Sequence, residues 1–249
     1  MKKLLLCLAG VVLLAGVGVG VYAWRMDTQR EEKAQRFFAA RQSASLDQSD
    51  DVLEEIPVDF TELQDVNPDV FAWITIPNTA LDAPVLQRKD DVSYYLSHNW
   101  RGEKDPNGAI CSESKYNGTD FSDPHTVLYG NNCSDGQLFG CLESYADEQF
   151  FKEHRTIAVY MPDAIRYYRV FAAYEYDSRH LLESFDFSDL KEKQRYIGEI
   201  LKQRDLYAQI DRETVVEDDD SILTLSTGSS REIGKTYLVQ AILEKSFYF

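Results

Sequence analysis

Cysteine, serine and histidine side chains are the groups in this chain that could give it covalent chemistry. A thiol or hydroxyl attacks a carbonyl group only when a nearby base or a lowered pKa activates it. No C-x-x-C pair is present and the histidines are scattered, so the spacing matches no zinc pattern and no metal is predicted. The candidates are four cysteines (Cys7, Cys111, Cys133 and Cys141) and four histidines (His98, His125, His154 and His180).

The cysteines also bear on disulfide bonding. Cys7 lies in an apolar N-terminal segment, which leaves three thiols in the rest of the chain. An odd number cannot all pair within one chain. We expect buried free thiols, while a bridge from Cys133 to Cys141 or to Cys111 stays open because it depends on geometry.

Two short β-branched runs end without a nucleophile or a base. Residues 222–228 read Ile-Leu-Thr-Leu-Ser-Thr-Gly and predict a strand that ends in a turn. Residues 126–132 read Thr-Val-Leu-Tyr-Gly-Asn-Asn and predict a second strand. Gly228 has no side chain to attack a substrate, and Asn131 cannot titrate near neutral pH.

The remaining pattern predicts a mainly β domain that forms a barrel or a sandwich, because short β-branched and aromatic runs alternate with turn residues. A long helix interrupts it: Ser188 is suited to be the N-cap, and apolar residues recur at helical spacing as far as Leu206. A short helix is predicted from Phe60 to Asn67. The predicted strands cover residues 71–76, 84–87, 108–111, 126–129, 156–160, 167–174, 223–227 and 237–243.

Several motifs, in the same order, resemble class B sortases. They are VFAWITIPNTALDAPVLQ, YYLSHNWRGEKDPNGAI, TVLYGNNCSDGQLFGCLESYADEQFF and a T-L-S-T strand that follows a long helix. The resemblance runs from about Asp59 to Leu243. It implies an eight-stranded sortase-type β-barrel with N-terminal helices and a long helix before the penultimate strand.

Sortases are cysteine transpeptidases, and the resemblance implies three site positions. In the family a cysteine after T-L-S-T attacks a sorting signal, a histidine in Y-G-H-N handles protons, and an arginine before the last strand steadies the oxyanion. This chain has Gly228, Asn131 and Thr236 at these positions, with Lys235 the counterpart of the arginine if the register moves by one. The chain is therefore predicted to be catalytically inactive.

The alternative to an inactive chain is an active enzyme whose nucleophile and base lie at other positions than in the family. Cys133 lies two residues past Asn131 and is the best candidate for a moved nucleophile. Ser226 and Ser229 flank Gly228, but a serine still needs a base. His125 would lie about 20 Å from Asn131 along an extended strand, and Glu113 stands where the family tends to carry an acid. The predicted cleft residues are Glu113, Asn131, Cys133, Thr227, Gly228, Ser229, Lys235 and Thr236.

Three parts are expected along the chain. Residues 1–24 combine Lys2 and Lys3 with an apolar run long enough to span a bilayer as a helix, which takes roughly 20 residues. The lysines favour a cytoplasmic N-terminus, so the domain would face outside. A cleaved signal peptide is the alternative for this segment. Residues 25–56 predict a juxtamembrane helix and spacer, and residues 57–249 the sortase B-like domain.

The net charge of the chain limits the classes of partner that it can bind. The net charge of −16 argues against nucleic acid, since phosphate binding needs clustered lysine and arginine. The acidic run from Glu217 to Asp220 could bind Ca²⁺. It lacks the alternating ligand spacing of a calcium loop, so a solvated turn is predicted.

The sequence thus predicts a single-pass protein of the cell membrane whose sortase B-like domain lies outside the cell. Its predicted role is non-catalytic binding of a sorting-signal-like peptide or a cell-surface partner, with no cofactor. Two alternatives stay open. One is an active transpeptidase that anchors cell-wall proteins or assembles pili through Cys133, and the other is a purely structural envelope protein.

Overall fold

The computed structural model describes residues 56–249. The predicted membrane anchor, the juxtamembrane helix and Cys7 lie outside the described residues. The strands are β1 (Val70–Thr75), β2 (Asp82–Arg88), β3 (Ile110–Glu113), β4 (His125–Tyr129), β5 (Thr156–Tyr160), β6 (Ala164–Asp177), β7 (Gln209–Ile210), β8 (Ile222–Gly228) and β9 (Lys235–Tyr248). The helices are α2 (Phe60–Val66), η2 (Tyr94–Leu96), η3 (Leu142–Ala146), α3 (Glu148–Glu153), α4 (Leu181–Ser184) and α5 (Leu190–Leu201).

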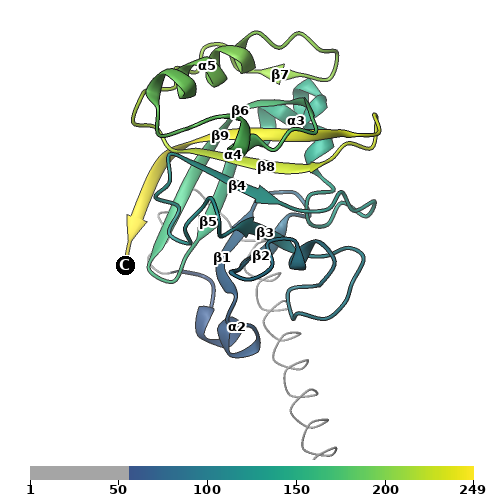
Figure 1. The fold of residues 1–249 in the computed structure, drawn as a ribbon, viewed down its shortest axis with the longest axis vertical. Helices are drawn as coiled ribbons and strands as arrows, with labels where there is room; N and C mark the ends of the chain where they lie inside the picture. The colour runs from purple at the N-terminus through teal and green to yellow at the C-terminus, as the bar shows by residue number, and fades with distance from the viewer. Residues whose placement is uncertain (1–55) are drawn as a thin grey trace, which may run out of the picture. The chain divides into compact units, whose positions relative to one another are not determined.

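Eight of the strands in residues 56–249 close into a barrel (Figure 1). Their order is β5-β1-β2-β3-β4-β8-β9-β6, and β5 pairs with β6 to complete the ring. The pairs β2–β3 and β4–β8 are parallel, and the other pairs of the ring are antiparallel. The short strand β7, which the sequence did not predict, pairs with β6 outside the ring. The predicted eight-stranded barrel is confirmed.

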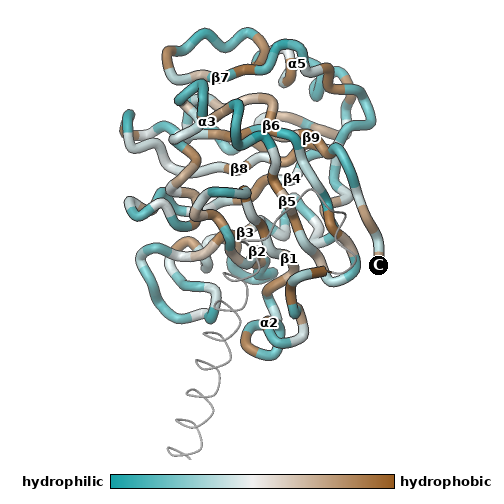
Figure 2. The backbone as a smooth tube through the Cα atoms, turned by 180° about the vertical axis from the view of Figure 1, so that it is seen from behind, coloured by the Kyte–Doolittle hydropathy of each residue, from teal (hydrophilic) through white to brown (hydrophobic). Residues whose placement is uncertain are grey.

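Alternation along the strands gives the barrel an inner and an outer face. In β8, Leu223 and Leu225 join the core inside the barrel, whereas Ile222 joins a second core. Tyr196 and Ile200 of α5 belong to this second core, so α5 covers the outer face of β8 and β9. Figure 2 shows that hydrophobic residues concentrate in the strands, while the connecting loops are mostly hydrophilic.

The long helix α5 begins one residue later than predicted. Its N-cap is Asp189, whose carboxylate accepts a hydrogen bond from the amide of Lys191 at 2.8 Å. Ser188 makes other hydrogen bonds: its amide and its hydroxyl both donate to the Asp186 carboxylate. The prediction of Ser188 as the N-cap was therefore wrong by one position.

The same helix ends at Leu201, before the predicted end at Leu206. Leu206 is 84% exposed, so it does not belong to the buried face of the helix. The residues just after Leu201 are polar and would bury nothing in a further turn. Arg212 instead donates to the carbonyl oxygen of Leu201 and, at 2.9 Å, to that of Gln203.

The acidic run before β8 is not a purely solvated turn, because its backbone carbonyl oxygens bind a buried lysine side chain. Lys193 of α5 is 3% exposed. Its Nζ donates to the carbonyl oxygens of Glu217, Asp218 and Asp220 at 3.2, 2.7 and 2.6 Å. An ammonium group has three N–H donors, so all of them are used here. Lys193 therefore ties α5 to the segment that leads into β8.

Two further expectations concern thiols and membrane crossing. Cys111, Cys133 and Cys141 are buried free thiols, as the sequence predicted.

Between Ile56 and Phe249, no helix is long and apolar enough to cross a bilayer. The apolar run 4–24 lies outside this range.

Candidate functional site

The ends of β4 and β8 and the start of β9 lie side by side at one end of the barrel. Tyr129 at the end of β4 pairs with Ser226, and Gly228 at the end of β8 pairs with Thr236. Asn132 spans the gap beyond β4, because its side-chain amide donates to the carbonyl oxygen of Gly228 at 3.1 Å. The structure thus brings the predicted positions after β4, at the end of β8 and at the start of β9 together.

Strand alternation decides which of these residues face the cleft. Gly228 and Thr236 share the outer face of the sheet with Leu238, which belongs to the outer core. Thr227 points to the inner face, opposite Tyr237 of the inner core. Thr227 is 3% exposed. Its placement in the predicted cleft was therefore wrong, because the strand turns its side chain into the barrel.

Open space surrounds the position of a side chain at Gly228. A Cβ atom built at this residue would meet no other heavy atom within 4 Å, and its φ lies outside the left-handed region. Glycine is therefore not required by the backbone here, unlike at Gly108, where φ is +65° and a Cβ would lie 2.5 Å from the Tyr95 carbonyl oxygen. A side chain at residue 228 would point into solvent above the outer face.

Asn131 connects two loops by hydrogen bonds. Its side-chain amide donates to the carbonyl oxygens of Leu96 and Asn107 at 3.0 Å each and approaches that of Pro106 at 3.4 Å. These carbonyls belong to the long connection between β2 and β3. Together with Asn132, this residue fixes the connection and the end of β8 relative to β4.

Lys235 and Ser229 converge on an acid that faces away from Gly228. Lys235 alternates with Thr236 along β9, so it points to the opposite face of the strand. Its ammonium group lies 2.6 Å from Glu232 and 3.9 Å from Glu175, and the Ser229 hydroxyl donates to Glu175 at 2.8 Å. Lys235 therefore does not supply a cation above Gly228.

Thr236 is the residue that stands opposite Gly228. Its hydroxyl donates to the carbonyl oxygen of Asp177 at 3.4 Å, a long hydrogen bond. A neutral hydroxyl lacks the charge and the paired donors with which arginine binds an oxyanion. The start of β9 thus offers the cleft a weak hydrogen-bonding group.

Cys133 is buried near the end of β4. Burial raises the pKa of its thiol, and the carboxylates of Asp135 and Asp105 raise it further. The thiolate is the reactive form of cysteine, so this environment works against nucleophilic attack. His125 lies at the opposite end of β4, where its Nε2 is 2.6 Å from the Thr224 hydroxyl.

A pair that the sequence did not connect borders the outer face of β4. His180 Nε2 lies 2.6 Å from Glu113 Oε2 and 3.4 Å from the Tyr129 hydroxyl. Both side chains are largely buried, at 29% and 17% exposed. Glu113 and His180 are 67 residues apart, and only the barrel's strand order brings the end of β3 next to the segment before α4. Glu113, predicted from the resemblance, is thus paired with His180.

Comparisons with known proteins agree with this architecture. No family model matches the chain. Sortase B of Listeria monocytogenes is 31% identical over 229 residues, which cover 91% of this chain and 88% of the relative. Sortase B of Staphylococcus aureus is 28% identical over 174 residues, covering 70% of this chain and 69% of that protein. The solved S. aureus sortase B–substrate complex matches with a TM-score of 0.68 and 26% identity, covering 88% of this chain and 98% of that one. The eight-stranded barrel, the order of the motifs and this similarity together show that the chain belongs to the sortase B family.

Proposed function

We propose that this protein is a membrane-anchored, extracytoplasmic sortase B-like protein that binds a sorting-signal-like peptide without cleaving it. The observation that carries the proposal is Gly228, at the end of β8. The motif resemblance aligns it with the family's cysteine, and here the position is open space with no side chain. A thioacyl intermediate needs a sulfur atom at this point.

The neighbouring groups do not replace the missing sulfur. Ser226 is 8% exposed, and Ser229 donates its hydroxyl to a carboxylate. Cys133 is buried with a raised pKa. Asn131 uses its amide on loop carbonyls and has no group that titrates near neutral pH. A nucleophile–base pair is therefore missing from the cleft side of β4, β8 and β9.

Hydrogen bonds nevertheless hold the loops around Gly228 in place. Asn131 and Asn132 fix the β2–β3 connection and the end of β8 by direct hydrogen bonds. A groove whose loops are already held in place loses less entropy when a ligand binds. The related S. aureus enzyme has been solved in complex with its substrate, which supports a peptide or a cell-surface protein segment as the ligand class here.

The membrane location rests on the sequence. The run from Leu4 to Trp24 is apolar and long enough to span a bilayer, and it follows Lys2 and Lys3. In this proposal the run anchors the chain, and the domain of residues 57–249 faces the outside. Protease digestion of intact cells should remove the domain, whereas protection of the domain would contradict this orientation.

The binding proposal is tested with the full chain and a sorting-signal peptide. We expect the peptide to shift the NMR signals of residues around Gly228 and Asn131 and to remain uncleaved after prolonged incubation. A peptide of the same composition in scrambled order serves as the control. Turnover of the peptide would support an active transpeptidase instead, and the absence of any shift would support a purely structural protein.

A further inference from the structure

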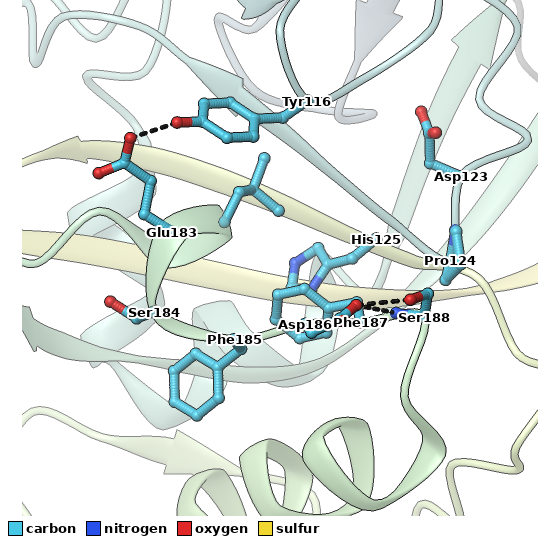
Figure 3. Close-up of a pocket in the computed structure, with 11 residues that line it drawn as sticks. Tyr116, Asp123, Pro124, His125, Glu183, Ser184, Phe185, Asp186, Phe187 and Ser188 are labelled. Atoms are coloured by element: carbon cyan, nitrogen blue, oxygen red, sulfur yellow. Dashed lines mark hydrogen bonds between the residues drawn. The ribbon is translucent and has the colours of Figure 1, made fainter.

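A pocket lies at the start of β4, at the opposite end of this strand from Tyr129 (Figure 3). Its volume is about 400 Å³. One wall comes from the connection between β3 and β4, and the other comes from residues 182–188, between α4 and α5. Figure 3 shows the imidazole of His125 between the ring of Tyr116 and the segment that carries Phe185 to Ser188.

The charged groups of this pocket are all acids. Asp123, Glu183 and Asp186 line it, and its lining contains neither lysine nor arginine. Lys115 lies just outside and neutralises part of the Glu183 charge at 3.2 Å. The two aspartates therefore carry most of the negative charge that faces a ligand.

The side-chain hydrogen bonds of each aspartate within the domain go to one of its two carboxylate oxygens. Asp123 accepts from the Gly118 amide at 2.8 Å through Oδ2. Asp186 accepts from the Ser188 amide and hydroxyl, at 3.0 and 2.6 Å, through Oδ1. The internal hydrogen bonds hold both carboxylates in place at the pocket wall.

The hydrogen bonds around His125 assign its tautomer. The Thr224 hydroxyl donates to Gln240 Oε1 at 2.7 Å, so it must accept the hydrogen bond from His125 Nε2–H at 2.6 Å. His125 Nδ1 is then an acceptor without a hydrogen atom, and it has no partner within residues 56–249. His125 is 2% exposed, and burial and Lys193 together lower its pKa to about 3. The imidazole therefore stays neutral at physiological pH.

We propose that this pocket binds the basic side chain of a lysine or arginine residue from a partner peptide. The charge of that side chain would be attracted by the three acids of the lining, and its N–H groups would donate to the Asp186 carboxylate. Leu182, Phe185 and Phe187 provide apolar surface for the alkyl stem, as amphipathic cations prefer. A metal ion fits less well, because within the described domain no three acidic, histidine or cysteine groups gather closely enough to hold one.

The pocket and the cleft can act together but do not depend on each other. His125 and Tyr129 lie on the same face of β4, about 13 Å apart at the usual rise of a strand. The segment before and through α4 borders both sites, since His180 contacts Tyr129 and Glu183 lines the pocket. A peptide seated in the cleft could extend a basic residue into the pocket, but a small cation suffices to test the pocket.

The experiment titrates the full chain with blocked amino acids and follows the NMR signals of residues 182–188. Nα-acetyl-lysine amide and Nα-acetyl-arginine amide, whose side chains are free and charged, are expected to shift these signals. Nα-acetyl-norleucine amide, whose side chain lacks the charge, is expected to bind at least about fivefold more weakly. The two cations show whether an ammonium or a guanidinium group is preferred.

A matched pair of variants separates the pocket from general charge effects. Asp186→Asn should weaken binding of the preferred cation about fivefold. Asp91→Asn removes a charge from the same kind of turn, in which Asp91 accepts from the Ser93 amide and hydroxyl at 3.1 and 2.9 Å, and Asp91 is not part of the pocket lining. It should leave binding unchanged. Equal binding of norleucine amide, equal losses in both variants, or no shifts at tens of millimolar cation would each overturn the proposal.

Discussion

At the scale of single residues, Gly228 and Asn131, on which the proposed function rests, differ in what surrounds them. A side chain added at Gly228 would enter open space, so no neighbouring side chain would have to move. Asn131 instead makes two 3.0 Å hydrogen bonds and a longer third one that hold a neighbouring loop. Placing a cysteine at residue 228 and a histidine at residue 131 should therefore have different effects on the protein.

Gly228→Cys is expected to fold normally, with unfolding free energy within about 0.5 kcal/mol of the parent, because the new side chain enters open space. Without an imidazole beside it, the thiol should titrate near the unperturbed value of about 8.5. The rate of alkylation as a function of pH measures this directly. A midpoint well below neutral pH would mean that another group activates the thiol.

Asn131→His is expected to destabilise the protein by about 0.5–1.5 kcal/mol, because the hydrogen bonds of Asn131 are exposed and water can replace a lost donor. A neutral imidazole has one N–H group, so at least one of the Leu96 and Asn107 carbonyl oxygens loses its donor. Hydrogen exchange should accelerate in residues 94–108 and stay unchanged in the barrel strands. Unchanged protection of that loop would show that the amide is not what holds it.

At the scale of elements, polar side chains attach the pieces that cover the barrel. Lys193 ties α5 to the turn before β8 through three carbonyl oxygens. Arg155, just before β5, binds Asp211, just after β7, at 2.6 Å. Both contacts link segments that are far apart in the chain, which explains why neither was visible in the sequence pattern.

Lys193→Met is expected to lower the unfolding free energy by about 1.5–3 kcal/mol, because it keeps the apolar stem but removes three hydrogen bonds to a charged donor. Lys191→Met is the matched control, since Lys191 is an exposed lysine of the same helix. Urea unfolding of both variants measures the difference. Equal losses would mean that the carbonyl contacts contribute nothing specific.

Asp211 should make stability sensitive to acid. Burial raises its pKa, but hydrogen bonds from Arg155 and Thr214 and from the backbone lower it more, to about 2. The folded state thus binds the proton less tightly than the unfolded state, so the stabilisation is complete above about pH 4 and is lost as the pH falls towards 2.

Asp211→Asn should remove this part of the pH dependence. Urea unfolding at several pH values between 2 and 5 is the measurement. The variant should lose less stability than the parent as the pH falls through this range. Parallel curves for the two proteins would show that Asp211 is not a source of the acid sensitivity.

At the scale of the whole molecule, local patterns predicted most strands because each strand carries its own β-branched or aromatic run and turn residues. They left a barrel and a sandwich open, and the eight-stranded barrel was predicted from the resemblance to class B sortases. Side-chain orientation at the strand ends was harder. Thr227 was placed in the cleft, but register with Tyr237 turns it inward. The pairing of Glu113 with His180 depends on the strand order, which no single segment encodes. The end of α5 was missed because Leu206 fits helical spacing but lies beyond the last buried turn.

The central claim is that the cleft holds a peptide without forming a covalent bond to it. Intact-protein mass spectrometry of the full chain after incubation with a sorting-signal peptide tests this most directly, with Gly228→Cys plus Asn131→His and Thr236→Arg as the positive control. The account predicts an unchanged protein mass for the native chain under conditions in which the peptide is bound. A mass increase that corresponds to an acyl fragment of the peptide on any side chain of the native protein would contradict it.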